Sequence, residues 1–192
     1  WCATGAGLNV FDPADSTFIV FSHIYGSENA IAHPIVHCLE RDDWGRVWVG
    51  TQAGLSVVDS QLQVENILEP DIPDYGGFTD PVFSLESTDD HLIWVGSSTS
   101  LMCIDDQGRV LSQYANAVSI KEGLSGGSIL SLLEDRGGSV WIGTFSRGLF
   151  RFSQQQQIFK HYELLESSQN GRDEVWTVYP LDDDRCLAGS NK

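Results

Sequence analysis

The feature that most constrains this chain is a motif of Trp, an apolar residue, Gly and Thr or Ser that returns at a nearly constant interval. The best copies begin at Trp48 and Trp141, a weaker copy begins at Trp94, and two divergent copies begin at Trp1 and Leu187. The intervals between consecutive copies are 47, 46, 47 and 46 residues. Because a fixed period of this length identifies a repeat architecture, we expect each unit to fold into one similar supersecondary element.

Each repeat contains the pattern of four short strands. In the clearest repeat these are Ile129 to Glu134, a strand around Trp141, a Gly-Leu strand from Gly148, and Ile158 to Tyr162, with an Asp- and Gly-rich turn before the Trp strand. Asp and Gly tolerate turn conformations, and short strands separated by turns predict an all-β fold. Four strands in 46 to 47 residues are typical of one β-propeller blade.

We therefore predict an all-β chain of about four β-propeller blades, each a four-stranded antiparallel sheet. Residues 1-192 are expected to form a single partial propeller, with blades at 1–23 (partial), 35–68, 82–114, 129–162 and 175–192 (partial). No segment shows a sustained apolar period of 3.6 residues, which disfavours helical repeats.

The regular spacing of the motif suggests that its residues have a structural role. The three tryptophans are predicted to pack between neighbouring sheets, and the glycines two residues later to allow a close backbone approach or a bulge. The Thr or Ser after each glycine is expected to bond one blade to the next. The residues concerned are Trp48, Trp94 and Trp141, Gly50, Gly96 and Gly143, and Thr51, Ser97 and Thr144.

The four cysteines, Cys2, Cys38, Cys103 and Cys186, occupy positions that apolar strand residues fill in other repeats. This placement predicts four buried thiols that act as small hydrophobic side chains. A disulfide stays open as the alternative, and no Cys-x-x-Cys spacing suggests zinc. No metal or other cofactor is expected.

The charge of the chain excludes some classes of partner. There are 27 acidic and 11 basic residues, which gives a formal net charge of -16. This charge opposes a phosphate backbone and an anionic membrane surface, so nucleic-acid binding is not expected. No apolar run approaches the ~20 residues of a spanning helix, and no signal peptide opens the chain. We expect the sequence to be a segment of a longer protein.

Two stretches, Lys121 to Phe152 and Arg41 to Asp59, resemble the two-component regulator propeller repeat; the first includes SILSLLEDRGGSVWIGTFSRGLFRF. The resemblance implies a seven-bladed propeller that serves as the sensor domain on the periplasmic or extracellular side of a bacterial inner-membrane receptor. It also implies a histidine kinase or diguanylate cyclase output outside this sequence. Because 192 residues hold about four blades, we expect the remaining blades of the parent, or self-association, to cover this segment.

Two loops carry the candidate ligand-binding residues. The turn after the Trp141 strand contains Phe145 and Arg147, an aromatic ring and a guanidinium group that suit a glycan or a carboxylate. The link before the third blade contains Asp71 and Tyr75, where acids beside aromatics suit a sugar or a cation. Binding residues favour loops held by a rigid scaffold, but a solvated surface turn is the alternative for both loops.

Catalysis has little support in the sequence. There is no Gly-x-Ser-x-Gly elbow, His-Glu-x-x-His pair or phosphate-binding Gly loop. The turn around Asp43 partly resembles the Asp-box of sialidase-like propellers, but Arg41 stands where that motif prefers Ser. We expect a sensing propeller that binds a small molecule or a glycan and is not an enzyme. A protein-interaction scaffold is the alternative, and a carbohydrate-active enzyme is a third possibility.

Overall fold

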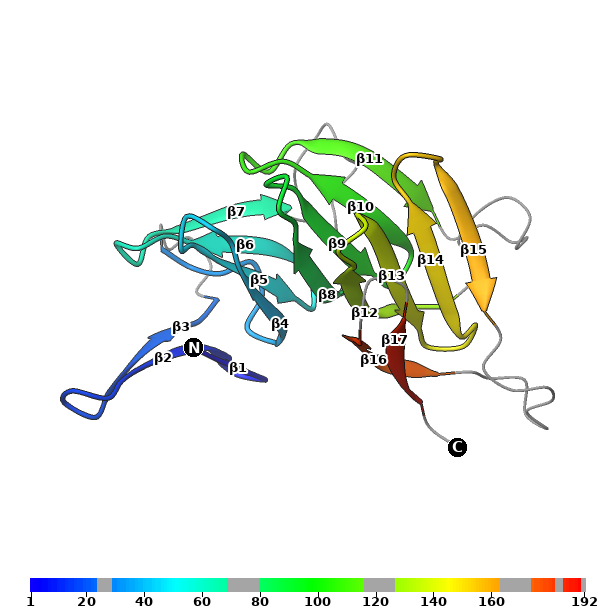
Figure 1. The fold of residues 1–192 in the computed structure, drawn as a ribbon. Helices are drawn as coiled ribbons and strands as arrows, with labels where there is room; N and C mark the ends of the chain where they lie inside the picture. The colour runs from blue at the N-terminus through cyan, green and yellow to red at the C-terminus, as the bar shows by residue number, and fades with distance from the viewer. Residues whose placement is uncertain (24–28, 69–79, 116–126, 163–173, 182–184, 191–192) are drawn as a thin grey trace. The chain divides into compact units, whose positions relative to one another are not determined.

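The computed structural model describes residues 1–23, 29–68, 80–115, 127–162, 174–181 and 185–190 (Figure 1). All regular secondary structure in these residues is β-strand, arranged in five sheets in which each strand pairs with its neighbour in the chain. Three of the sheets have four strands, which confirms the predicted fold class. The chain divides into two compact units, Trp1–Leu85 and Glu86–Lys192, and each is described by itself.

The strand bounds follow the sequence repeat. The first sheet has three strands: β1 (Cys2–Thr4), β2 (Gly7–Asp12) and β3 (Thr17–Phe21). The second has β4 (Val36–Arg41), β5 (Val47–Thr51), β6 (Gly54–Val58) and β7 (Val64–Leu68). The third has β8 (Val82–Ser87), β9 (Ile93–Ser97), β10 (Ser100–Ile104) and β11 (Val110–Ala115). The fourth has β12 (Ile129–Glu134), β13 (Ser139–Thr144), β14 (Leu149–Ser153) and β15 (Ile158–Tyr162), and the fifth has β16 (Val175–Pro180) and β17 (Cys186–Ser190).

The core of the unit Glu86–Lys192 lies between successive sheets. Trp141 packs with Val175 and Val178 of β16, whereas its neighbour Ile142 packs with Trp94 of β9. Side chains that follow each other along a strand point to opposite faces of the sheet. Each second strand therefore turns its Trp toward the following sheet and the next residue toward the preceding one.

The same rule holds in the unit Trp1–Leu85. Val49 and Val58 of the second sheet form a buried cluster with Leu8 and Phe21 of the first sheet. Val49 follows Trp48 as Ile142 follows Trp141, and it likewise faces the preceding sheet. The packing surface of both units is thus the flat face of a short sheet, filled by strand residues at fixed repeat positions.

The Asp side chain in the turn before the Trp strand has a structural role. The two carboxylate oxygens of Asp135 accept hydrogen bonds from the backbone N–H of Ser139 at 2.9 Å and from Nε1 of Trp141 at 2.9 Å. Arg151 donates its Nη2 hydrogen to the same carboxylate at 2.8 Å. Asp42 repeats the arrangement, since it accepts a bond from Nε1 of Trp48 at 3.0 Å. One buried carboxylate therefore orders the turn, the indole and an arginine together.

The third sheet lacks this carboxylate. Thr88 stands six residues before Trp94, the position that Asp135 has relative to its Trp, and its hydroxyl group bonds the backbone of Leu92. Nε1 of Trp94 is consequently buried without a hydrogen-bond partner among the described residues. An unsatisfied buried donor costs about 1–3 kcal/mol, a cost that Asp42 and Asp135 remove for the indoles of Trp48 and Trp141.

The motif glycines lie where the next sheet comes close. A Cβ atom on Gly143 would meet Ser131 of its own sheet and lie 2.6 Å from Cγ1 of Val175. On the facing strand β12 the register shifts between Ile129 and Ser131, which marks a β-bulge opposite the glycine. Gly50 has the same surroundings, with its register shift between Val36 and Cys38.

The residues after these glycines do not bond one sheet to the next, so that prediction is wrong. The hydroxyl groups of Thr51 and Thr144 donate to the carbonyls of Gly54 and Gly148, each at 2.9 Å, and Ser97 bonds the carbonyl of Ser100 at 3.0 Å. These bonds close the tight turn that follows each Trp strand. In the fourth sheet the Gly148 carbonyl also accepts the backbone N–H of Thr144 at 3.1 Å, so the hydroxyl adds a second bond across the turn.

The four thiols are free, and the prediction that all four are buried is wrong for Cys2. Cys103 is buried, while Cys38 and Cys186 are half-buried. Cys2 is exposed because it pairs with Asn9 on the face of the first sheet that is turned away from the second sheet. Burial raises the pKa of Cys38 to about 12 and that of Cys103 to about 11.

We expect the thiols to differ sharply in reactivity. The thiolate is the nucleophile, so burial and a raised pKa protect Cys38 and Cys103 from maleimide at pH 7.5, whereas Cys2 reacts. Peptide mass spectrometry after a short labelling pulse measures all sites at once. Modification of Cys103 as fast as that of Cys2 in the folded protein would contradict the packing described above.

Candidate ligand-binding site

The turn after each Trp strand lies beside the start of the first strand of its own sheet. The backbone N–H of Gln52 donates to the carbonyl of Ile35, and that of Phe145 donates to the carbonyl of Ser128, both at 2.9 Å. Gln52 and Phe145 hold the same position in their repeats, four residues after the Trp. This backbone link brings two loop sets to one edge of each sheet, and that edge is the candidate site.

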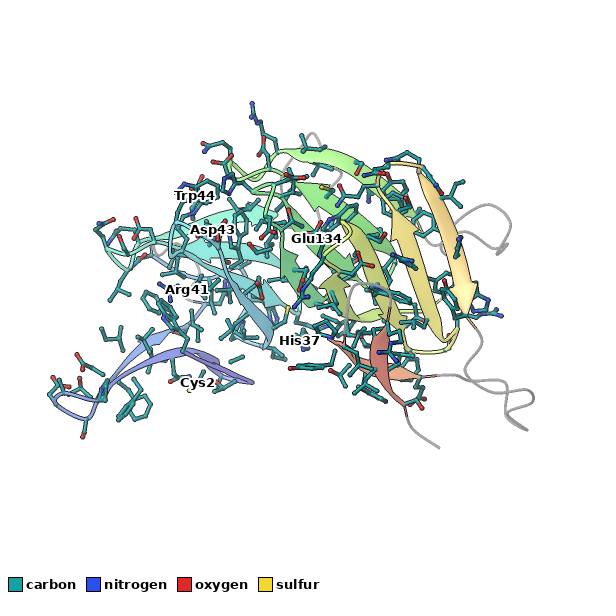
Figure 2. The ribbon with its side chains drawn as sticks, in the orientation of Figure 1. Cys2, His37, Arg41, Asp43, Trp44 and Glu134 are labelled. Carbon is teal, nitrogen blue, oxygen red and sulfur yellow. The ribbon has the colours of Figure 1, made fainter. Side chains whose placement is uncertain are left out.

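The β-bulge adds a side chain to this edge. At each bulge one residue of the first strand has no paired residue on the second strand. These residues are His37 in β4, Leu130 in β12 and Trp176 in β16. A bulge leaves the extra residue outside the regular pairing and can re-aim its side chain. His37 is labelled on its strand in Figure 2. His37 contacts Gln52 in the turn of its own sheet, and Trp176 contacts Phe145 in the turn of the preceding sheet.

An exposed aromatic pair forms the centre of the candidate site in the unit Glu86–Lys192. The rings of Phe145 and Trp176 meet edge to face, with centroids 6.2 Å apart and an interplanar angle of 88°. Phe145 is 37% exposed and Trp176 is 48% exposed. Two aromatic rings that pack against each other and stay exposed to solvent can bind a ligand with apolar faces.

Arg147 supplies positive charge on the same turn. Its backbone is fixed at both ends, because its N–H donates to Oγ1 of Thr144 at 3.1 Å and its carbonyl accepts from Nε2 of His161 at 2.6 Å. His161 is itself held against Phe150, with ring centroids 4.6 Å apart. The Arg147 side chain is exposed, so a rigid turn presents a guanidinium group three residues from the Thr that closes it.

The unit Trp1–Leu85 has a polar version of this edge. Nε2 of His37 lies 2.9 Å from Oε1 of Gln52, and the His37 ring lies 4.9 Å from that of Phe83. Nearby, Nδ1 of His33 accepts the N–H of Ile35 at 3.1 Å. Partial burial, with smaller contributions from His23 and His37, lowers the pKa of His33. The neutral imidazole of His33 thus helps to fix the backbone just before β4.

We expect the unit Trp1–Leu85 to lose stability on mild acidification. The lowered pKa of His33 means that the unfolded chain binds a proton at a higher pH than the folded chain does. The free energy of unfolding therefore falls as the pH drops below about 6.5, the ordinary pKa of histidine. Urea unfolding between pH 8 and 5 measures the slope, and His33→Gln should reduce it. A slope unchanged by this substitution would contradict the assignment.

The structure describes only two of the four predicted ligand-binding residues. Phe145 and Arg147 lie on one turn, and Trp176, which the sequence analysis missed, meets Phe145 there. The signal that could have found Trp176 is an aromatic residue at the repeat position of His37, the second residue of a first strand. Asp71 and Tyr75 lie outside the described residues. Within the described ranges no three His, Cys, Asp or Glu side chains are grouped to bind a metal, and no helix there could span a membrane.

Two segments of the repeat described above match a known family model. The two-component regulator propeller family matches residues 31–53 and 123–146. These two segments are similar to two-component regulator propeller repeats. Each match begins before a first strand and ends in the turn after a Trp strand, so it covers the edge that holds the candidate site. No curated protein matches the chain in sequence.

Solved structures share the fold of these propeller repeats. The extracellular domain of BT4673 from B. thetaiotaomicron, named as a hybrid two component system, has a TM-score of 0.73 at 19% identity, over 98% of this chain and 24% of that one. A streptogramin B lyase has a TM-score of 0.66 at 11% identity, over 96% of this chain and 55% of that one. Virginiamycin B lyase from Staphylococcus aureus has a TM-score of 0.60 at 14% identity, over 82% of this chain and 49% of that one.

These similarities establish a propeller fold and no activity. This chain spans about a quarter of the BT4673 domain and about half of each lyase. The sheets described above are therefore propeller blades, with the candidate site at the edge where each first strand begins.

Proposed function

We propose that this chain is part of the ligand-sensing propeller of a bacterial signal-transduction receptor and that it binds rather than catalyses. The observation that carries the proposal is the exposed Phe145–Trp176 pair, with Arg147 two residues after Phe145 on the same turn, at the blade edge that the repeat family matches. Support for a receptor comes from the repeat family and from the likeness to an extracellular domain of a hybrid two component system. The proposed location is the periplasmic or extracellular side of the membrane, with a histidine kinase or diguanylate cyclase as output elsewhere in the protein.

The proposed ligand is a small molecule or a glycan that has apolar faces and a carboxylate. The rings of Trp176 and Phe145 offer stacking surfaces at low conformational cost, and Arg147 offers a fork that matches a carboxylate. Asp71 and Tyr75, in the link before the third blade, remain proposed ligand-binding residues in their own right. A neutral glycan would contact the aromatic pair alone, whereas a ligand with a carboxylate would also contact Arg147.

Calorimetric titration with neutral and uronic-acid oligosaccharides tests this function. Trp176→Ala is expected to weaken binding by at least about tenfold, as truncation of a central aromatic residue does in other sites. Arg147→Gln should weaken only the acidic ligands. Trp44→Ala is the matched control, because Trp44 is similarly exposed but lies in the turn at the other end of β5. An equal loss with Trp44→Ala, or no loss with Trp176→Ala, would refute the proposed site.

A protein-interaction scaffold is the second candidate function. Trp176, Tyr179 and Leu181 are all exposed along and after one strand, and aromatic residues are enriched at protein interfaces. If this function holds, Trp176→Ala and Tyr179→Ala should weaken a protein complex while oligosaccharide binding is absent in the unaltered chain. The same two variants thus separate the candidates.

A further inference from the structure

The turn that carries Phe145 and Arg147 is longer than the turns after the other two complete Trp strands. Three residues separate Thr144 from Gly148 in this turn. The corresponding turns have two residues, at 52–53 and at 98–99. Gly148 has a positive φ of 72°, as expected for the residue that closes a three-residue hairpin loop. The extra residue gives this turn one more side chain and one more backbone carbonyl than its counterparts.

The first two residues of the turn are held by the segment that leads into β12. The backbone N–H of Phe145 donates to the carbonyl of Ser128 at 2.9 Å. Ser146 lies against Gly127, where a Cβ atom would come within 2.8 Å of the Ser146 hydroxyl oxygen. Both contacts come from one edge of the fourth sheet, where its first strand begins.

The third residue of the turn is held by His161 on β15, at the opposite edge of the same sheet. The carbonyl of Arg147 lies 2.6 Å from Nε2 of His161, and this nitrogen carries the hydrogen because a carbonyl oxygen can only accept. His161 lies directly opposite Phe150, with ring centroids 4.6 Å apart and an interplanar angle of 33°. Since Phe150 is buried in the core, the imidazole is a well-ordered donor to the turn.

The position of His161 is polar in the other two four-stranded blades. Gln113 in β11 and Asn66 in β7 lie opposite the residues that correspond to Phe150. Nε2 of Gln113 donates to Oγ of Ser100 at 3.4 Å, at the end of the shorter turn of its blade. Nδ2 of Asn66 instead donates to the carbonyl of Ala30 at 3.0 Å. In the third and fourth blades, therefore, a side chain of the fourth strand reaches the turn after the Trp strand.

We propose that His161 is a positioning residue of the ligand site and that it sets the preference for acidic over neutral ligands without contacting either. This inference rests on the proposed function above. The direction of the Arg147 side chain follows from the backbone on both sides of its Cα atom. Thr144 fixes the N–H of Arg147 at 3.1 Å, and His161 fixes its carbonyl.

The two ligand classes depend differently on this fixed backbone. Without the bond from His161, the peptide group after Arg147 is free to rotate, and the guanidinium group leaves the turn in several directions. A carboxylate that binds two parallel N–H groups of one guanidinium then loses affinity. A neutral sugar that stacks on Phe145 and Trp176 keeps its contacts.

Hydrogen exchange in the ligand-free chain tests whether His161 orders the turn. We expect His161→Leu to raise the exchange rate of the Arg147 amide by about tenfold, the effect of losing one ordinary hydrogen bond. The amide of Phe145, which Ser128 holds, should change by less than about threefold. His161→Gln should preserve the slow exchange of Arg147, because a glutamine N–H reaches the corresponding turn in the third blade.

Calorimetric titration with a uronic-acid oligosaccharide and its neutral counterpart tests the effect on selectivity. The measured quantity is the ratio of the two dissociation constants. We expect His161→Leu to lower the preference for the acidic ligand by about fivefold to tenfold, with the neutral ligand nearly unaffected, and His161→Gln to restore it. Phe159→Leu is the matched control, because Phe159 lies on the same face of β15 but packs against Phe152. General loosening of the blade weakens both ligands alike, so this control should leave the ratio unchanged.

Failure of this inference and failure of the proposed function give different results. If Trp176→Ala weakens oligosaccharide binding while His161→Leu changes neither the ratio nor the exchange rate of Arg147, the site stands and the positioning role is refuted. Equal losses for both ligands in His161→Leu, or no restoration by His161→Gln, also refute it. If no oligosaccharide binds the unaltered chain, the proposed function and the selectivity role fail together, while the exchange rate still shows whether His161 orders the turn.

Discussion

Replacing Asp135 with alanine is expected to destabilise the unit Glu86–Lys192 by about 3–5 kcal/mol, which is the usual cost of removing one partner of a buried ion pair. The carboxylate accepts bonds from Nε1 of Trp141 at 2.9 Å and from Nη2 of Arg151 at 2.8 Å. Asp135→Ala leaves both donors and the N–H of Ser139 without this acceptor beside the buried Trp141 indole. Urea unfolding followed by circular dichroism, with hydrogen exchange to locate the change, measures the loss.

Asp105 provides the matched control for this substitution. It closes a turn of the same form, with backbone bonds from Gln107 and Arg109, but no indole reaches it and its Arg109 partner is largely exposed. Asp105→Ala should therefore cost only about 1 kcal/mol, as expected for a capping bond and a surface ion pair. Equal losses for the two substitutions would show that the turn alone, and not the buried indole and arginine, accounts for the effect of Asp135.

A second substitution separates the charge from the packing. Arg151 lies with its guanidinium carbon 5.2 Å from the centre of the Trp141 ring, so its stem covers apolar surface as well as carrying charge. Asp135→Ala combined with Arg151→Met removes both charges and keeps much of that stem. We expect the double variant to be more stable than Asp135→Ala alone, because an unpaired, half-buried cation is no longer present.

The all-β fold and the strand pattern were predictable because the repeat is long and its anchors are chemically distinctive. Trp, Gly and an upstream acid recur at fixed spacing, and each has one good structural use in a short sheet packed on both faces. The turn before the third Trp strand is an exception to this pattern. Asp89 and Asp90 suggest the same turn chemistry, but the position that faces the indole is occupied by Thr88.

The candidate site was only partly predictable, because it depends on where strands are irregular. The bulge that brings Trp176 beside Phe145 is visible in the pairing register, and the sequence shows only that an aromatic residue stands at the repeat position of His37. Burial was mispredicted for Cys2 for a related reason. Its repeat position is apolar elsewhere because another blade covers it, and the sequence of one strand does not report whether such a cover is present.

Replacing Gly50 with alanine is expected to destabilise the unit Trp1–Leu85 by about 3 kcal/mol, the upper part of the usual range for an overpacked core. The backbone of Gly50 does not require glycine, since its φ is not positive; the constraint is space. A Cβ atom there would meet Sγ of Cys38 and lie 2.8 Å from Cγ1 and 3.1 Å from the carbonyl oxygen of Val82. The methyl group must therefore displace the neighbouring strand and not just a flexible side chain.

Gly5→Ala is the matched control in the same unit, because a Cβ on Gly5 meets no atom within 4 Å and its substitution should change stability by less than about 0.5 kcal/mol. Combining Gly50→Ala with Cys38→Ala removes the sulfur contact but leaves the carbonyl of Val82 in place. We expect this pair to recover only part of the loss, since backbone cannot move aside as a side chain can. Complete recovery in urea unfolding would mean that the sulfur alone excludes a larger residue, and that the close approach of the two strands is not the reason for glycine.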